Sequence, residues 1–275
     1  MKQLDVMQTE HLFYKHEISD NLPRNKFGMH THNTFEILYF LEGDATYIIE
    51  DRKYTLKKGD LILTRPLQCH SIQLESPAAY ARYSIQFDAE QMGVESVALL
   101  PDDVDVINLG SNDIAEVLFQ KCELYRKKCT PELFERIVTL LLCELFYNIA
   151  LFPRPHSPSA ASVSPLISKA LKYINENLYT VQRIEEVADH LFVSESYLFR
   201  LFQKELQQTP KKYILEKRLL MAQKMLQTGE RPTVVCERCG FGDYATFYRN
   251  YQAFFGHSPS TGHSDAFPTD PQTSI

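Results

Sequence analysis

Four side chains in the first part of the chain have the types and spacing needed to bind a ligand or a metal ion. His30 and His32 are one residue apart, Glu36 follows His32 by four residues, and His70 comes later. On an extended segment side chains alternate with period two, so we expect His30, His32 and Glu36 to share one side. A later strand can bring His70 opposite them. Imidazole and carboxylate donors suit Mn, Fe, Ni or Zn, and spacing alone does not choose among these ions.

Three uses of these side chains are compatible with the sequence. They can hold one divalent ion, line the pocket of a sugar-like molecule, or hydrogen-bond within a barrel mouth. A small-molecule pocket is favoured, because a barrel mouth with apolar walls and a few convergent polar groups is a default binding site. The expected ligand-binding residues are His30, His32, Glu36, Tyr39, Tyr47, His70 and Tyr83, with Phe35 as another wall candidate, although each aromatic residue could equally be core.

A second group of candidate residues lies near the C-terminal end, on two segments with helical periodicity. The first segment predicts a short helix, a tight turn at 192–194 and a second helix. The pattern returns about 49 residues later, with a turn at 240–243. Helix, short turn and helix is the arrangement that places a recognition helix in the major groove of DNA. The two apolar stripes of the second helices are Leu198, Leu201, Phe202 and Leu206, then Phe247, Tyr251, Phe254 and Phe255.

The faces opposite these stripes carry the residues expected to contact DNA. Arg249 occupies the place in the second unit that Arg200 occupies in the first. One long helix over 210–227 joins the units, so two recognition helices should meet successive major grooves, roughly 34 Å apart. The expected DNA-binding residues are Ser196, Tyr197, Phe199, Arg200, Gln203, Lys204, Tyr244, Ala245, Tyr248, Arg249 and Gln252.

The charge distribution agrees with this placement. The chain of 275 residues has a net charge of -6, which is unusual for a protein that binds nucleic acid. Residues 165–263, however, carry 13 Lys and Arg against 10 Asp and Glu, whereas residues 1–164 carry 16 against 23. The basic excess is therefore located where DNA binding is expected.

Composition also indicates the cellular environment. No stretch approaches the ~20 apolar residues that a membrane span needs, and the N-terminus lacks the apolar core of a secretory signal. We therefore expect a cytoplasmic protein without membrane contact. The six cysteines should be free thiols in a reducing compartment. Cys236 and Cys239 are interpreted as small buried residues and not as a redox or zinc pair.

Five segments are expected along the chain, giving an α+β protein. Strand-like runs such as 35–42 and 80–87 predict an N-terminal β-barrel. A helical segment includes a helix that begins at Pro131, after the capping residue Thr130. The expected boundaries are 1–110 for the sensor barrel, 111–151 for the helical segment, 152–165 for a linker, 166–263 for the all-α DNA-binding domain and 264–275 for a disordered tail.

The C-terminal part resembles the AraC/XylS family of bacterial regulators over residues 166–259. Two positions depart from the family pattern: residues 260–263 replace the usual Tyr-Arg, and Gln252 replaces a Lys. Both departures remove phosphate contacts and lower the expected affinity for DNA. The resemblance is carried by Ile184-Glu185-Glu186-Val187-Ala188, Ser194, Tyr197-Leu198-Phe199-Arg200-Leu201-Phe202, Thr209-Pro210, Tyr213-Ile214, Arg218-Leu219, Ala222, Gly240-Phe241, Phe247-Tyr248-Arg249 and Gly256-His257-Ser258-Pro259.

The N-terminal part resembles the cupin barrel of sensor domains in that family. In metal-dependent cupins the equivalents of His30, His32, Glu36 and His70 bind one divalent ion. The pattern departs at Arg24 and Gln68, where a Gly is common. The residues that carry this resemblance are His30-Thr31-His32-Asn33-Thr34-Phe35-Glu36, Gly43, Gly59-Asp60, Pro66 and His70.

The resemblance implies a transcription regulator, more often an activator, that binds double-stranded DNA and a small-molecule effector. It also implies a homodimer and contact with RNA polymerase. The helices over 112–150 resemble the family's dimerisation segment, but packing of Ile137, Leu141 and Glu144 against the barrel would give the same apolar face. A metal-dependent cupin enzyme, such as an isomerase or dioxygenase, is the second hypothesis, and tandem recognition helices argue against it. A constitutive architectural DNA-binding protein is the third.

Overall fold

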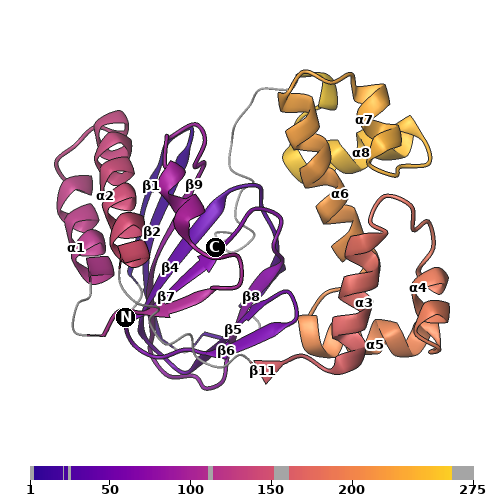
Figure 1. Ribbon diagram of the computed structural model, residues 1–275, viewed down its shortest axis with the longest axis horizontal. Helices are drawn as coiled ribbons and strands as arrows, with labels where there is room; N and C mark the ends of the chain where they lie inside the picture. The colour runs from indigo at the N-terminus through magenta and orange to yellow at the C-terminus, as the bar shows by residue number, and fades with distance from the viewer. Residues whose placement is uncertain (1–2, 21, 24–25, 111–113, 152–160, 262–275) are drawn as a thin grey trace.

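The computed structural model describes residues 3–20, 22–23, 26–110, 114–151 and 161–261 (Figure 1). It shows an N-terminal pair of antiparallel sheets with two helices on one side, and a helical C-terminal region on the other. The α+β class expected from the sequence is therefore confirmed. The expected tail, residue Arg24 and the helix start at Asn112 lie outside the described residues.

The larger sheet has six strands. The run 35–42 forms β4 and the run 80–87 forms β9, as the alternation of side chains predicts. In spatial order the strands are β1 (Gln3–Gln8), β2 (Leu12–Ser19), β9 (Tyr80–Phe87), β4 (Phe35–Glu42), β7 (Asp60–Thr64) and β10 (Val106–Asn108).

The smaller sheet has five strands and faces the larger one. An apolar core between the sheets includes Phe27, Leu38, Phe40, Tyr47 and Ile72. In spatial order the strands are β11 (Ala161–Ser162), β6 (Arg52–Thr55), β5 (Ala45–Ile49), β8 (His70–Leu74) and β3 (Phe27–His30).

The outer face of the larger sheet is covered by η1 (Glu95–Leu99), α1 (Ile114–Arg126) and α2 (Pro131–Leu151) (Figure 1). The alternate residues of each strand point to this side, where Leu12, Ile37 and Ile85 pack against Phe119 and Phe146. The core of this layer is separate from the core between the sheets. One face of β4 therefore packs against the helices, and the other faces the space between the two sheets.

The C-terminal region is entirely helical. The helices are α3 (Pro165–Glu176), α4 (Ile184–His190), α5 (Glu195–Leu206), α6 (Pro210–Gln227), α7 (Pro232–Arg238) and α8 (Tyr244–Phe255), followed by η2 (Pro259–Thr261). Helix α6 has the bounds expected from the sequence. Cys236 and Cys239 are buried in the core of this region, as expected. None of the described helices is both long and apolar enough to cross a bilayer.

The end of the expected linker belongs to the barrel. Residues 152–160 lie outside the described residues, whereas Ala161–Ser162 form β11 and pair with β6. Val163 is buried in a core that joins Met29, Ile48 and Cys69 of the barrel to the first helices of the C-terminal region. The two halves of the chain therefore share apolar packing.

Candidate functional site

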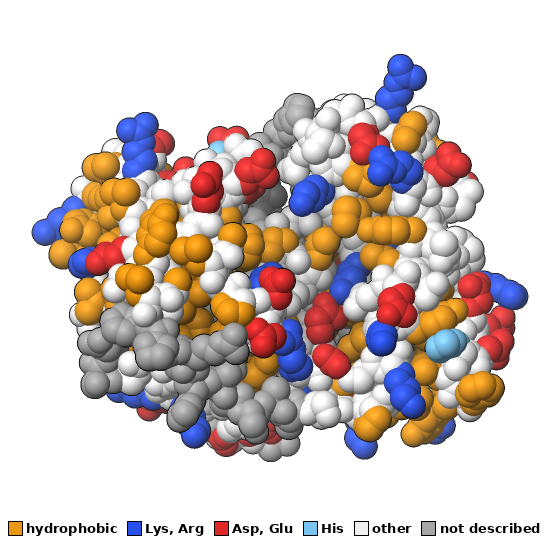
Figure 2. All heavy atoms as spheres, viewed as in Figure 1, with side chains coloured by type: hydrophobic (Ala, Val, Ile, Leu, Met, Phe, Trp, Pro, Cys, Tyr) orange, Lys and Arg blue, Asp and Glu red, His pale blue; other side chains and the backbone are white. Residues whose placement is uncertain are grey.

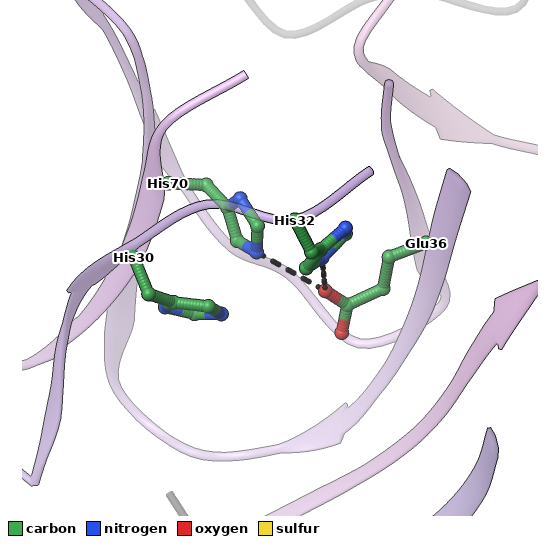
Figure 3. Close-up of side chains that lie close together, drawn as sticks. All are labelled: His30, His32, Glu36 and His70. Atoms are coloured by element: carbon green, nitrogen blue, oxygen red, sulfur yellow. Dashed lines mark hydrogen bonds and ion pairs between the residues drawn. The ribbon is translucent and has the colours of Figure 1, made fainter. Parts of the chain in front are cut away.

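Four predicted side chains, His30, His32, Glu36 and His70, meet at the mouth of the barrel, and we call them the histidine cluster (Figure 3). One ligand atom from each lies within 4.8 Å of those of the others. His30 ends β3, His70 begins β8 directly opposite it, and Glu36 lies on β4 in the other sheet. The four side chains therefore come together only because the two sheets face each other.

The hydrogen bonds of the histidines determine which nitrogen faces the centre. Nδ1 of each ring lies 2.9–3.0 Å from a main-chain oxygen, that of Gly28, Thr34 or Gln68. A carbonyl oxygen only accepts hydrogen bonds, so Nδ1 must carry the proton. A neutral ring then presents the lone pair of Nε2 to the centre. Metal-binding histidines characteristically donate their other N–H to such a group.

The contacts of Glu36 make a cation in the cluster chemically reasonable. Its Oε2 lies 3.2 Å from Nε2 of His32 and 3.1 Å from Nε2 of His70. Two neutral rings with protonated Nδ1 would turn lone pairs toward a carboxylate, which is repulsive. The repulsion is removed if the rings carry second protons or if a metal ion lies between them. The donor set therefore fits a divalent ion.

The charge states of the cluster agree with that use. Burial alone would raise the pKa of Glu36, but the imidazoles of His32 and His70, which donate hydrogen bonds to it when they are protonated, outweigh burial and hold the pKa well below its usual value. Burial, and then the neighbouring His70, hold the pKa of His30 well below its usual value. An ionised carboxylate and a neutral imidazole are the forms that bind metals.

The aromatic candidates lie on opposite sides of the larger sheet, Tyr47 on the smaller sheet that faces it and Tyr39 and Tyr83 on the side of α1. Tyr47 lies beside the cluster, with its ring stacked 6.0 Å from His70 and its hydroxyl 3.1 Å from Thr64 Oγ1. The prediction for Tyr39 and Tyr83 was wrong, because both face α1 and stack on Phe119. Tyr39 is three residues from Glu36 on the same strand, so its side chain must point the other way.

A cleft of about 590 Å³ opens beside the histidine cluster and separates the barrel mouth from α6. His32 contributes to its wall, so a ligand in the cleft can reach the cluster. Most of the lining residues are polar, whereas Pro66, Leu67 and Ala89 are apolar and Phe35 stacks on Phe87. The lining residues are Glu10, His11, His32, Asn33, Thr34, Phe35, Pro66, Leu67, Phe87, Asp88, Ala89, Glu90, Gln91, Gln223, Lys224, Gln227 and Thr228.

Hydrogen bonds from the residue after His32 connect the barrel mouth to α6. Asn33 follows His32, and its side-chain amide donates to the main-chain oxygen of Leu220 and to Gln223 Oε1, both at 2.9 Å. Sequence reasoning did not identify Asn33. Its position between two candidate ligands is a signal, but its partner is 187 residues away and could not be inferred.

The residues expected to contact DNA lie on the outward faces of α5 and α8. All eleven are exposed except Tyr248, which is partly buried. Both helices begin with a side-chain cap: Ser194 accepts a hydrogen bond from the N–H of Tyr197, and Asp243 accepts one from that of Thr246. The opposite faces are buried through Leu198, Phe202, Phe247 and Tyr251, as the periodicity predicts.

Arg218 on α6 holds the two helix-turn-helix units together. Its guanidinium donates to the carbonyl oxygens of Leu178 and Val181, before the first unit, and of Gly240, in the turn of the second, at 2.6–2.9 Å. Gly240 lies so close to Tyr179 that an added Cβ would be 2.2 Å from its carbonyl oxygen. The two recognition helices are therefore held in one relative orientation.

Helix α2 has an apolar face toward the barrel and another toward solvent. Leu141 is buried against the sheet and Ile137 packs beside it, whereas Glu144 is exposed. For these residues the structure favours packing against the barrel. Hydrophobic side chains also gather on the surface over α1 and α2 (Figure 2). The exposed large hydrophobic residues of α2 are Leu133, Leu140, Tyr147 and Leu151, with exposed fractions of 50–80%.

Comparison with known proteins finds two matching family models. One, described as an AraC-like ligand binding domain, matches residues 17–98 and so includes the histidine cluster. The other, described as a helix-turn-helix domain, matches residues 187–262 and includes α5 and α8. The matches correspond to the two parts of the chain that contain the candidate sites.

Related sequences extend over nearly the whole chain. The HTH-type transcriptional activator RhaR of Enterobacter sp. (strain 638) is 24% identical over 88% of this chain and 89% of its own. The raffinose operon transcriptional regulatory protein RafR of Pediococcus pentosaceus is 25% identical over 85% and 86%. Among solved structures, ToxT from Vibrio cholerae O395 is 12% identical over 92% of this chain and 97% of its own, with a TM-score of 0.40.

Proposed function

Because the chain belongs to the AraC family of transcription regulators, which are DNA-binding proteins and not enzymes, we propose that it activates transcription in the cytoplasm in response to a sugar. The observation that carries this proposal is the cleft that the histidine cluster shares with α6. A molecule bound there contacts the ligand-binding domain and the helix between the two DNA-reading units. Ligand binding and DNA binding are thus coupled by direct contact.

The chemistry of the cleft supports a neutral polyhydroxylated ligand. Glu10, Asp88 and Glu90 contribute carboxylates, and they outnumber the lysine, Lys224. Carboxylates and amides bind hydroxyl groups, and an aromatic ring packs against the apolar face of a sugar. Relatives named for raffinose and lactose operons agree with this ligand class. A metal ion held by the histidine cluster would supply a Lewis-acidic centre for ligand oxygens at the wall of the cleft.

DNA reading is assigned to α5 and α8. Arg200 and Arg249 are the bidentate donors expected to read guanine, and the exposed Tyr197, Phe199 and Tyr244 offer apolar contact with thymine methyl groups. Two copies of the chain pair through the exposed apolar face of α2, and the DNA-bound dimer contacts RNA polymerase. Pairing raises operator affinity, because the second copy binds at a high effective concentration.

A selection from random double-stranded DNA tests the DNA-binding part of this proposal. We expect the full chain to enrich one sequence, with contacts in successive major grooves and an affinity that falls steeply with salt. A protein that enriches no sequence at low salt would contradict it.

Ligand sensing is tested separately on the selected operator. We expect a neutral sugar to raise the thermal unfolding midpoint of the wild type and to change its operator affinity. Asn33→Ala should keep its operator affinity without sugar but lose most of the response, because a ligand acts only through differential affinity for two states. Glu36→Gln should lose sugar response and metal content together, with Glu10→Gln, outside the cluster, as the metal control. Full response in Glu36→Gln would remove the cluster from the site.

A further inference from the structure

A second group of side chains able to bind a metal ion lies on the helix-covered face of the larger sheet. Asp5 on β1 is directly opposite His16 on β2 in the antiparallel register. Glu123 on α1 reaches the same place, with Oε1 3.6 Å from His16 Nδ1. One ligand atom from each of the three residues lies within 4.8 Å of the others. Two strands and a helix thus present one nitrogen and two carboxylate donors together.

The surroundings of His16 indicate that a partner is missing from its contacts. The residue is 5% exposed, and neither ring nitrogen has a hydrogen-bond partner in the described part of the chain. Tyr83 covers one face of the ring at 4.1 Å. A buried polar group without a partner is destabilising, and such groups characteristically bind a water or an ion. The ring therefore requires a ligand at its edge.

The distance between His16 and Glu123 suits a shared ion better than a direct bond. At 3.6 Å the two atoms are too far apart for a hydrogen bond. Two donors that each lie about 2.0–2.2 Å from a tetrahedral ion are separated by about 3.3–3.6 Å. Tyr83 also donates a hydrogen bond of 2.9 Å to the other oxygen of Glu123, which orients the carboxylate as an outer-shell partner does.

The charges at this place permit a divalent cation. Arg126 forms an ion pair of 3.0 Å with Asp5, so it both neutralises part of the negative charge and competes for that carboxylate. Asp5, Glu123 and Arg126 together carry a charge of -1. The side chains of Asp5 and Glu123 are about one quarter exposed, so water can complete the coordination shell.

We propose that Asp5, His16 and Glu123 form a second divalent-metal site, which binds Zn²⁺ or a similar ion of the first transition row through one imidazole and two carboxylates. The ion joins β1, β2 and α1. It therefore fastens the first strand and the helical pair to the sheet. This site is independent of the histidine cluster and of the effector cleft, which lie on other surfaces of the barrel.

Equilibrium dialysis of the full chain against Co²⁺ tests the site, with visible absorption as a second readout. Asp5→Asn should carry one metal equivalent fewer than the wild type, whatever the histidine cluster binds. Its affinity at this site should fall by more than the about 10- to 100-fold expected for loss of an outer-shell partner. His11→Ala, which removes the other histidine of the same β-hairpin, is the matched control and should bind as the wild type does.

A second variant separates metal binding from simple ion pairing. Arg126→Gln removes the competing cation and should bind Co²⁺ at this site severalfold more tightly than the wild type. If Asp5 instead serves only to pair with Arg126 and binds no metal ion, this variant will gain no affinity for Co²⁺. Equal metal content and equal affinity in the wild type, Asp5→Asn and Arg126→Gln would overturn the proposal.

Discussion

The two helix-turn-helix units have similar recognition helices but pack against different parts of the molecule. The core of the first unit, around α3 to α5, includes Met29, Ile48 and Cys69 of the barrel. The core of the second unit, around α7 and α8, consists of residues 215–255 where the chain is described. A change in the barrel therefore reaches the first unit by direct packing and the second through α6.

Polar contacts reinforce this difference. Glu50, in the turn after β5, accepts hydrogen bonds from Tyr213 and Lys217 at the start of α6, while Ser168 on α3 donates to Asp51. Asn33 contacts α6 farther along, at Leu220 and Gln223. The second unit is in turn fastened to the first by Arg218 and Gly240. Helix α6 therefore contacts the barrel and both units.

The contact between the two units should show the largest effect. Gly240 has φ +75° and lies against the Tyr179 backbone, so Gly240→Ala must move one unit relative to the other. We expect a loss of about 3 kcal/mol or more in urea unfolding. Gly229→Ala is the control, with φ +86° but open space around its Cβ, and should cost about 1–2 kcal/mol. Equal losses would show that the units are not held together at Gly240.

The contact between the barrel and the first unit should show the next largest effect. Lys217 is buried and lies 2.7 Å from Glu50 and 3.0 Å from Asn175. Lys217→Met should lower the unfolding free energy by about 2 kcal/mol, because it removes hydrogen bonds of a charged group and leaves Glu50 partly unpaired. Lys224→Met, exposed two turns later on α6, should stay within about 0.5 kcal/mol of the wild type. Similar values for both variants would argue against a stabilising link.

DNA recognition by the two units can be separated with Arg200→Ala and Arg249→Ala. Each should cost about 1–3 kcal/mol in operator binding at fixed salt and relax base preference in its own half of the site. Competition binding against operators altered in one half measures this. Unchanged affinity and footprint in both variants would reject the assignment, and loss of preference in the same half would place both side chains in one groove.

The helix caps should show the smallest effect, and it differs in pH dependence. Hydrogen bonding from the Thr246 N–H holds the pKa of Asp243 below its usual 3.8. A lowered pKa in the folded state stabilises above the unfolded value, and this stabilisation disappears as the pH falls through the folded pKa. Asp243→Asn should therefore be less stable than the wild type at pH 7, with the difference shrinking below pH 3.8.

The cap of the first unit serves as the comparison. Ser194 does not titrate, so Ser194→Ala should cost about 1 kcal/mol at every pH. Thermal unfolding followed across pH measures both variants. A parallel pH dependence of the two differences would mean that Asp243 does not act through its charge.

Much of the C-terminal region was predictable, because recognition helices are specified by local patterns. The apolar spacing at Leu198 and Phe202 and the capping residue Ser194 indicated α5 with its exposed face. The types and spacing of the four side chains indicated the histidine cluster, but not the way it forms, because His30 ends β3 in the smaller sheet and Glu36 lies on β4 in the larger one. Alternation along β4 places Tyr39 on the face opposite Glu36.

Other features required the folded chain. Tyr83 is placed on the helix side by its pairing with Tyr39 across β9 and β4, and that register is not visible in either strand alone. Asp5, His16 and Glu123 come from three elements, and no spacing between them predicts their meeting. Asn33 and Gln223 line the same cleft only because the barrel packs against α6.

The chain's local periodicity and its capping residues were sufficient to define the helices of the DNA-binding region, and the types and spacing of residues 30–36 were sufficient to indicate part of the histidine cluster. These features depend only on neighbouring residues, so a short stretch of sequence is enough to recognise them. Three features arise from contacts between distant segments: the position of His70 beside Glu36, the cleft, and the hydrogen bond from Arg218 to the carbonyl oxygen of Gly240. Such contacts form because buried polar groups must find partners and apolar faces must be covered, and only the complete tertiary structure decides which segments satisfy both requirements.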